Sequence, residues 1–339
     1  MKKQSLVQIL ETLSATEKLE LLELLKSQEE PKVDLKSIRQ EVAKDSAITC
    51  PKCQSQSIIG HGQYRNRKRY MCKDCNSTFN EMSGTVLAGL KKPDKFQQSV
   101  ELLIDSISIR KVAIKLGIST HTAFDWRHKV LSGLTSVAST KMEGLVECDD
   151  KQMSISQKGD KHLNRPPYKR PSDRKTKRGV SNDKISIVVS TDRKGNSQMQ
   201  VAKVGRIDRD SLERTVGLLI DKDNILCSDS HPSIIAWAKE KHIEHHTFIA
   251  NKQKIKDKVY HVQHVNSLDS LLERWLIKFF GISSKYLQNY LSWFVLLQKT
   301  KNAKDILAAF AKQIMLSNNA INSFNKIPQK YHELVTLQY

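Results

Sequence analysis

The sequence predicts a multidomain protein in which small N-terminal modules precede a layered α/β domain with a mixed sheet and a helical C-terminus. Three observations predict this organisation. Two Cys-X-X-Cys pairs lie in residues 46–90, two helical patterns joined by a glycine lie in residues 91–140, and apolar strand-like runs alternate with helical patterns in residues 141–300. A chain of 339 residues is long enough for two or three domains.

Residues 1–45 are expected to form a small helical module and a linker. Leucines recur at helical spacing from Leu6 to Leu25, with a break near Ser14. The stretch from Glu29 to Asp45 is polar, and we interpret it as the linker. The leucine-bearing part fits a small packing module or an oligomerisation arm.

The two cysteine pairs of residues 46–90 are separated by eighteen residues, which is the spacing of a tetrathiolate zinc site on two knuckles. Two residues between the thiols of a pair let one tight turn present both sulfurs to a tetrahedral ion. The intervening residues Ile58, Ile59 and Tyr64 to Tyr70 are typical of strands, so we expect a zinc ribbon with one structural Zn²⁺. No thioredoxin-like pattern surrounds the pairs, which disfavours a redox role. The expected zinc ligands are Cys50, Cys53, Cys72 and Cys75.

Residues 109–127 resemble a helix-turn-helix. Val112, Ala113 and Leu116 would form the inner face of the first helix, Gly117 the turn, and Ser119 or Thr120 the cap of the second helix. A generic helical hairpin is the alternative. In a DNA-binding motif the exposed side chains of the second helix would enter the groove. These candidates are His121, Thr122, Asp125 and Arg127.

The α/β domain is expected from Leu145 onward. Leu145–Cys148 and Ile225–Ser228 read as strands, residues 184–204 as a hairpin, and the end of the chain from Val265 as helices. Cys148 and Cys227 are interpreted as small core residues in adjacent strands. Residues 301–339 are expected to be helical and carry no recognisable chemistry.

Acidic residues follow both of these strands, at Asp149 and Asp229. Carboxylates at the ends of neighbouring strands converge, and two Mg²⁺ ions that act on a phosphodiester need such a set. Asp269 could add a third carboxylate from the following helix, with Glu273 one turn later as the back-up. A cap or turn role is the alternative for each aspartate taken singly. Asp150 is an equally suitable ligand, and strand alternation puts it on the face opposite Asp149 without choosing between them.

The chain holds 56 Lys and Arg against 36 Asp and Glu, a formal net charge of +20, which implies an acidic partner. Nucleic acid is the leading partner and an anionic membrane the second, yet no apolar run is long enough to span a membrane. No signal peptide is evident, so we expect a cytoplasmic protein. Residues 151–179 hold ten Lys and Arg against two Asp. The expected phosphate contacts in the ribbon and in this segment are Arg65, Arg67, Lys68, Arg69, Lys169, Arg170, Arg174, Lys175, Lys177 and Arg178.

The order of ribbon, helix-turn-helix and acidic domain resembles the bacterial insertion-sequence DDE transposases of the zinc-ribbon plus RNase H-like (ISXO-type) class, over most of residues 48–297. Val146–Asp150 is similar to the first acidic strand of that family, and Ser228–Ser230 to its second aspartate. Residues 261–269, together with residues 281–291, resemble its third motif.

The resemblance implies an RNase H-like domain that cleaves DNA at terminal inverted repeats and joins the freed end to target DNA, with two Mg²⁺ ions for which Mn²⁺ can substitute. It also implies a homodimer or higher oligomer on double-stranded DNA. In relatives the position of Asp269 varies, and a Lys or Arg tends to follow it where this chain has Glu273, with Arg274 and Lys278 as the nearby bases. A non-catalytic DNA-binding regulator and a stand-alone nuclease are the alternatives.

Overall fold

The computed structural model describes residues 11–28, 33–45, 48–65, 67–135, 140–160, 163, 184–248, 255–256 and 259–336. It divides into two compact units, Met1–Asp34 and Leu35–Tyr339. In the first unit, helix α2 (Ala15–Gln28) begins after the predicted break. Ser14 and Glu17 form a reciprocal cap there: the Ser14 hydroxyl accepts from the Glu17 backbone N–H, and the Glu17 carboxylate accepts from that of Ser14.

Helix α3 (Leu35–Asp45) opens the second unit, so the predicted linker is wrong for these residues. Leu35, Arg39 and Val42 recur at helical spacing and are buried. The Arg39 guanidinium donates to the backbone oxygens of Met315, at 2.7 Å, and of Glu81. The polar composition of the stretch concealed a helix whose few apolar residues lie on one side.

The cysteine-bearing segment forms a three-stranded antiparallel sheet in the order β1-β2-β3, from strands β1 (Ile58–Tyr64), β2 (Arg67–Cys72) and β3 (Thr78–Phe79). Its core is small: Cys50, Cys72 and Phe79 are buried, and Ile58 and Tyr70 pack against them. A sheet this small has little apolar area to bury.

Three helices follow, α4 (Pro93–Ile104), α5 (Ile109–Leu116) and α6 (Thr120–Thr135). Gly117 ends α5 with φ 56°, in the left-handed region that glycine enters without strain. The Ser119 hydroxyl accepts from the Thr122 backbone N–H at 3.0 Å and so caps α6. Val112, Ala113, Leu116 and Ala123 form the buried cluster between these helices, as the pattern predicts.

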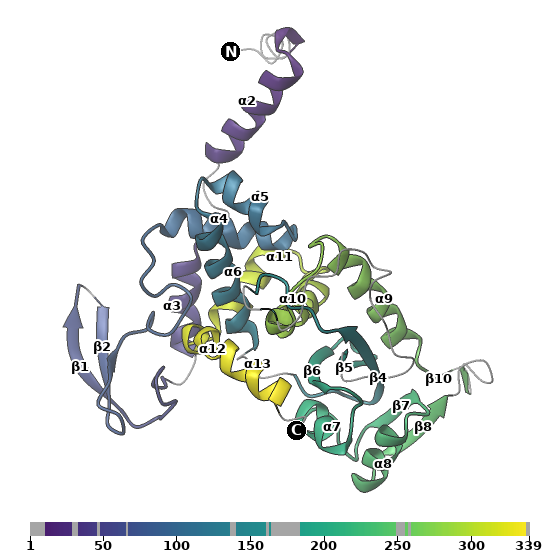
Figure 1. The fold of residues 1–339 in the computed structure, drawn as a ribbon. Helices are drawn as coiled ribbons and strands as arrows, with labels where there is room; N and C mark the ends of the chain where they lie inside the picture. Colours follow the sequence, from purple (N-terminus) through teal and green to yellow (C-terminus); the bar gives the residue numbers. More distant parts are fainter. Residues whose placement is uncertain are drawn as a thin grey trace. The chain divides into compact units, whose positions relative to one another are not determined.

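The α/β part is built on a five-stranded mixed sheet in the order β6-β5-β4-β7-β8. Strand β4 is central: it pairs antiparallel with β5 and parallel with β7, and β8 is parallel to β7 (Figure 1). The mixed sheet and its flanking helices confirm the predicted layered α/β organisation. The elements of this part are β4 (Leu145–Ser154), β5 (Lys184–Asp192), β6 (Ser197–Val204), α7 (Arg209–Val216), β7 (Ile225–Asp229), α8 (Pro232–Glu240), β8 (Glu244–Phe248), β9 (Ile255–Lys256), β10 (Tyr260–His261), α9 (Gln263–Ile277), η2 (Ser284–Tyr286) and α10 (Leu287–Thr300).

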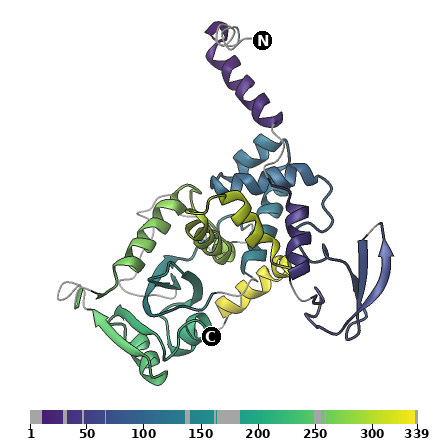
Figure 2. The same cartoon turned by 180° about the vertical axis from the view of Figure 1, so that it is seen from behind.

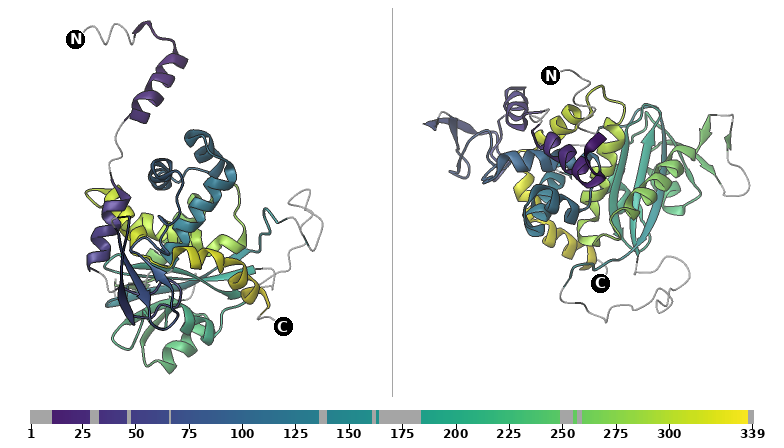
Figure 3. Two further views of the ribbon diagram at one scale, coloured as in Figure 1. Left: turned by 90° about the vertical axis from the view of Figure 1, so that its left-hand side faces the viewer. Right: turned by 90° about the horizontal axis from the view of Figure 1, so that it is seen from above.

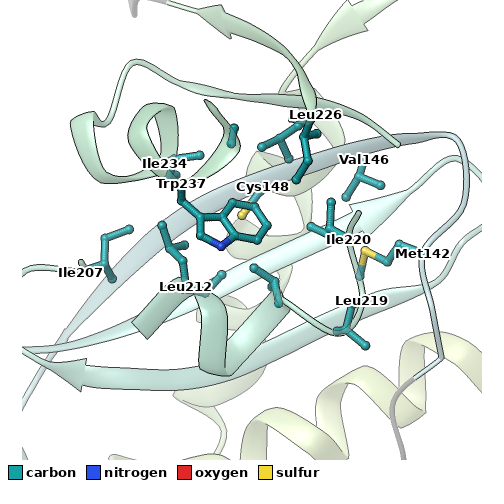
Figure 4. Packing of buried hydrophobic residues seen from close by; sticks show 14 of the residues in the cluster. Met142, Val146, Cys148, Ile207, Leu212, Leu219, Ile220, Leu226, Ile234 and Trp237 are labelled. Atoms are coloured by element: carbon teal, nitrogen blue, oxygen red, sulfur yellow. The ribbon is translucent and has the colours of Figure 1, made fainter. Parts of the chain in front are cut away.

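Helices cover both faces of this sheet. Helices α7 and α8 pack on one face and α9 and α10 on the other; Figure 3, left, shows the strands between them. Val146 and Cys148 point into the core beneath α7 and α8, where Trp237 is the largest side chain (Figure 4). Cys148 and Cys227 are both buried, in the adjacent strands β4 and β7, as expected for core residues. The opposite side of β4 therefore faces α9.

The chain ends in helices α11 (Ile306–Met315), α12 (Ala320–Asn325) and α13 (Ile327–Thr336), which confirms the expected helical C-terminus. Helices α11 and α12 pack against α6, and α11 also contacts α3 and α4 (Figures 1 and 2). Tyr290 and Trp293 of α10 are buried in an aromatic cluster with Trp275 and Phe279. In the part of the chain that the structure describes, no helix is both long and apolar enough to cross a membrane.

Candidate active site

Three carboxylates meet where strands β4 and β7 lie side by side. Cys148 of β4 is aligned with Ser228 of β7, so Asp149 and Asp229, the next residues of these parallel strands, are neighbours. Carboxylate oxygens of Asp149, Asp150 and Asp229 all lie within 4.8 Å of one another. Backbone donors orient two of them: Asp149 accepts from Asp150 N–H at 2.8 Å, and Asp229 accepts from His231 N–H at 3.1 Å. The structure thus brings both predicted aspartates together. The expectation that Asp149 follows its strand is wrong, because β4 continues to Ser154 and only Asp229 ends its strand.

Asp150 belongs to the same cluster, although it follows Asp149 directly in the strand. Strand alternation alone would direct its carboxylate to the opposite face. Strand β7 ends at Asp229, so β4 has no paired β7 residue beyond this point. The carboxylates of Asp149 and Asp150 can therefore both reach the end of β7. The sequence left the choice between Asp149 and Asp150 open, and the geometry brings both carboxylates into the cluster.

Burial and mutual repulsion perturb these acids. Burial, together with the negative charge of Asp229, raises the pKa of Asp149 to about 7. Burial also raises the pKa of Asp150, while the positive charges of His231 and Arg206 lower it. Like charges packed this closely disfavour the ionised state unless a cation lies among them, and oxygen-only ligands suit Mg²⁺.

Asp269 approaches the cluster from α9. Among the described residues it lies outside the group whose oxygens are all within 4.8 Å, but its charge contributes to the raised pKa of Asp149. Its Oδ1 atom is buried and has no hydrogen-bond partner. Burial raises the pKa of Asp269 to about 6, against the opposing effect of Lys151. A buried, unpartnered carboxylate oxygen next to three other carboxylates is the feature that a bound cation would satisfy.

Lys151 is a basic residue of this site. The sequence pattern placed it in the basic segment 151–179 that follows the strand, whereas it lies within β4. Its side chain is 12% exposed, and its ammonium group donates to Glu273 Oε1 at 2.7 Å. The proposed back-up ligand Glu273 is therefore held in an ion pair, with its side chain 66% exposed. The signal was present in the strand pattern, since Lys151 follows Asp149 by two residues and so shares its face.

A second polar cluster, also missed from the sequence, lies next to the carboxylates. Glu147 is buried, and oxygen and nitrogen atoms of Glu147, His261 and His264 lie within 4.8 Å of one another. Arg193 forms an ion pair with Glu147 at 2.9 Å. The available signal was a glutamate inside an otherwise apolar strand, because such a residue needs a partner.

The four cysteines of the small sheet converge on one point. All four sulfurs lie within 4.8 Å of one another, with Cys50 Sγ 3.6 Å from Cys75 Sγ and Cys53 Sγ 3.5 Å from Cys72 Sγ. Four thiolates placed about 2.3 Å from a tetrahedral Zn²⁺ would be about 3.8 Å apart, so the spacing fits that ion. The two knuckles have matching turns: Gln54 N–H donates to Cys50 O, and Asn76 N–H to Cys72 O.

The basic residues of this small sheet surround its hairpin turn. Arg65 and Lys68 are exposed, whereas Arg67 and Arg69 are half-buried. Arg69 donates to the Thr78 hydroxyl at 3.0 Å, and the Arg65 guanidinium lies over the exposed Tyr64 ring. Arg65 and Lys68 are therefore the residues most accessible to a phosphate.

The candidate groove-facing residues of α6 divide into two groups. His121 and Thr122 lie at its accessible N-terminal end, and His121 is close to Asp125. Arg127 is only 4% exposed; it donates to Ile107 O and lies over the Trp293 ring. The expectation that Arg127 is exposed is wrong, because α10 covers that side of α6.

The other basic candidates fall outside the described residues. These are Lys169, Arg170, Arg174, Lys175, Lys177 and Arg178.

Comparison with known families places a transposase domain over the site. The family model described as ISXO2-like transposase domain matches residues 141–295. The chain is 27% identical over 260 residues to the "Uncharacterized protein in transposable element ISH50" of Halobacterium salinarum, which covers 74% of this chain and 85% of that protein. It is 33% identical over 76 residues to the insertion element iso-IS1N protein InsA of Shigella dysenteriae, covering 22% of this chain and 81% of InsA.

Among solved structures the chain matches the Mos1 strand transfer complex with a TM-score of 0.28 and 12% identity, covering 73% of this chain and 78% of that one. It matches the mariner Mos1 paired end complex with Mg with a TM-score of 0.28 and 14% identity, covering 73% and 79%. At these TM-scores the likeness is too weak to support a shared fold or function.

Proposed function

Because this chain belongs to the insertion-sequence transposases and carries an ISXO2-like transposase domain, we propose that it is a DDE-type DNA transposase. In this proposal the α/β part is an RNase H-like domain. It hydrolyses a phosphodiester at the element's end. The freed 3′-hydroxyl then attacks a phosphodiester of the target DNA, which forms a new P–O bond and displaces the 3′-oxygen of the target strand. Both steps are displacements at phosphorus that differ only in whether water or the 3′-hydroxyl attacks, so one site can perform both.

The observation that carries this proposal is the convergence of Asp149, Asp150 and Asp229 where β7 ends beside the middle of β4. The residues present fit Mg²⁺, because the donors are all carboxylate oxygens and Asp269 Oδ1 is buried without a partner. When bound, the metal activates the attacking oxygen and stabilises the leaving one.

In this assignment Asp149 and Asp229 hold the ions between two strands. Asp269 closes the site from α9, and Asp150 is the alternative ligand from β4. Two Mg²⁺ ions are proposed, for which Mn²⁺ can substitute. Glu273 is the weaker candidate, because its ion pair with Lys151 would first have to break.

The N-terminal modules are proposed to recognise the element's terminal inverted repeats. One Zn²⁺ held by the four cysteines would stabilise the ribbon, and Arg65 and Lys68 would contact phosphates, with Arg67 and Arg69 beside them. His121 and Thr122 are proposed to face the groove from the helix-turn-helix, whereas Arg127 is left out because it is buried. Lys169, Arg170, Arg174, Lys175, Lys177 and Arg178 are proposed to hold the DNA near the metal site. Paired ends require a dimer or higher oligomer on DNA.

The experiment is a strand-transfer assay with DNA that carries the element's end and Mg²⁺. Wild type is compared with Asp149→Asn and Asp229→Asn, which keep the side-chain shape but remove the charge. Asp223→Asn is the matched control, because Asp223 is an exposed aspartate in the turn before β7. We expect cleavage and joining in wild type and in the control, and neither in the two site variants, with DNA binding retained throughout.

Two results would contradict the proposal. DNA binding without cleavage or joining by wild type would indicate a non-catalytic regulator. Cleavage without a joined product would indicate a stand-alone nuclease.

A further inference from the structure

Glu147 reaches across from β4 and caps the helix that carries Asp269. Its Oε2 atom accepts from the backbone N–H of His264 at 2.7 Å and from that of Val265 at 3.0 Å. Both amides belong to the first turn of α9, where backbone donors have no partner within the helix. Val262, the residue that precedes α9, provides no side-chain cap. The N-terminal cap of α9 is therefore provided by a carboxylate that lies 117 residues away in the sequence.

The other oxygen of Glu147 is contacted by one cation, Arg193, and by two histidine rings from a further segment. Oε1 pairs with Arg193 at 2.9 Å and lies 2.7 Å from His264 Nδ1 and 3.2 Å from His261 Nδ1. Arg193 also donates to Val259 O at 3.0 Å. Although Glu147, His261 and His264 are residue types that bind metals, the guanidinium already neutralises the carboxylate. We therefore interpret the cluster as an anchor and not as a metal site.

The anchor determines which part of α9 faces the carboxylates. Glu147, Asp149 and Lys151 are every second residue of β4 and so share one of its faces, with successive members about 6.7 Å apart. Val265, Asp269 and Glu273 are four residues apart on α9, which is about 6 Å per step. The spacing along β4 therefore nearly matches the spacing along α9. The two elements are in contact at both ends of these three-residue sets, from Glu147 to the Val265 amide and from Lys151 to Glu273. Asp269 is thereby held opposite Asp149.

Without a metal ion this arrangement is opposed by electrostatic repulsion. Asp149 and Asp269 carry like charges, and Asp269 Oδ1 has no partner. This repulsion favours movement of α9 away from β4. The buried Val265, Leu268 and Leu272 of α9 and the contacts at the two ends of the helix oppose it. Glu147 is 1% exposed; Arg193 pairs with its Oε1, and two backbone N–H groups of α9 donate to its Oε2. These contacts are therefore the ones best able to resist that movement.

We propose that Glu147 is a positioning residue that locks the N-terminus of α9 to β4 and so sets Asp269 at the metal site before the metal binds. This inference rests on the proposed function, since it holds that the anchor prepares the site for metal binding. Residues that orient ligands without touching the metal affect metal affinity by about 10- to 100-fold in other proteins.

The test uses the full zinc-loaded chain and Glu147→Gln, which keeps an acceptor for the helix amides but loses the ion pair. Amide hydrogen exchange is measured without divalent ions, and Mn²⁺ binding is followed by electron paramagnetic resonance. We expect faster exchange at His264 and Val265 with α10 unchanged, and about ten-fold weaker Mn²⁺ binding. Glu240→Gln is the matched control, because Glu240 is an exposed glutamate paired with Arg209. It should leave both readouts unchanged.

Arg193→Gln provides a second variant in case Glu147→Gln does not fold, because it removes the ion pair and leaves the cap in place. It should weaken Mn²⁺ binding in the same direction. Unchanged exchange in α9, or Mn²⁺ affinity within two-fold of wild type in both folded variants, would overturn the inference. If wild type itself binds no Mn²⁺ at this site, the proposed function fails instead, which is a separate result.

Discussion

Lys151 is the residue that links the central strand to the outer end of α9. Its ammonium group forms an ion pair with Glu273 and lowers the pKa of Asp269, which burial raises. Lys151→Ala would leave Glu273 unpaired beside the carboxylates and release the second contact between β4 and α9. We expect about a ten-fold slower cleavage rate at saturating Mg²⁺, with DNA binding retained.

Lys241→Ala is the control for this substitution, because Lys241 forms a comparable ion pair with Glu213 on the other face of the sheet. Equal rates for wild type and Lys151→Ala would show that the ion pair does not support the site.

His128 should make the stability of the protein depend on pH. It is buried between Phe124 and Tyr286, and it accepts a hydrogen bond from Asn289 on its Nδ1. Burial and the charge of Arg127 lower its pKa from 6.5 to about 3. Between these two values the unfolded chain binds a proton that the folded chain does not, so stability falls as the pH falls.

The expected contribution of His128 is a loss of about 1.4 kcal/mol in the free energy of unfolding per pH unit through this window. Denaturant unfolding of wild type and His128→Gln from pH 7 to pH 4 measures it. The variant should be less stable at pH 7 but lose less on acidification. His121→Gln, an exposed histidine of the same helix, should keep the wild-type slope. An equally steep slope in His128→Gln would assign the pH dependence to other groups.

At the residue scale, the sequence could predict the acids that follow the two apolar runs but not what surrounds them. Asp149 and Asp229 follow apolar runs, so their convergence could be predicted from strand pairing alone. Glu147 and Lys151 acquire roles only through α9, which begins more than 100 residues later. Arg127 shows the reverse: helical spacing allowed it to be exposed, and only the packing of α10 shows that it is buried.

At the scale of elements, the cysteine-bearing sheet has a small core. The buried members of its cluster are Cys50, Cys72 and Phe79, and two of these are proposed zinc ligands. Removing the metal with a chelator, or replacing a ligand as in Cys72→Ser, should therefore unfold this sheet. We expect one zinc per chain by mass spectrometry, and rapid hydrogen exchange in residues 48–82 once it is removed.

The mixed sheet serves as the internal control for zinc removal, since β4–β8 have their own core and should keep slow exchange. Wild-type exchange in residues 48–82 after complete zinc removal would show that the sheet does not need the metal.

Elements with a clear period or spacing could be predicted, and elements without one could not. The hairpin of β5 and β6 and the helices around Gly117 follow from alternation and from the glycine turn. Helix α3 was missed because its stretch is polar overall, and its buried side chains gain a partner only when α11 packs against it.

At the scale of the whole molecule, the strong positive charge makes a quantitative prediction about DNA binding. The formal net charge is +20, and Arg65 and Lys68 are exposed beside the hairpin turn of the small sheet. Each phosphate contact releases counterions, so the logarithm of the binding constant should fall linearly with the logarithm of salt concentration. Removing one contact should reduce the steepness of that line by about 0.9.

We expect Lys68→Ala and Arg65→Ala each to weaken binding to the element's end and to reduce the salt slope by about one contact, while the double variant reduces it by about two. Lys239→Ala removes the same charge from an exposed position on α8 and should leave the slope unchanged. Fluorescence anisotropy from 50 to 200 mM salt measures all four proteins against wild type. If Lys239→Ala lowered the slope as much as Lys68→Ala, total charge alone would explain binding. A distinct loss in the hairpin variants would instead assign the phosphate contacts to the small sheet.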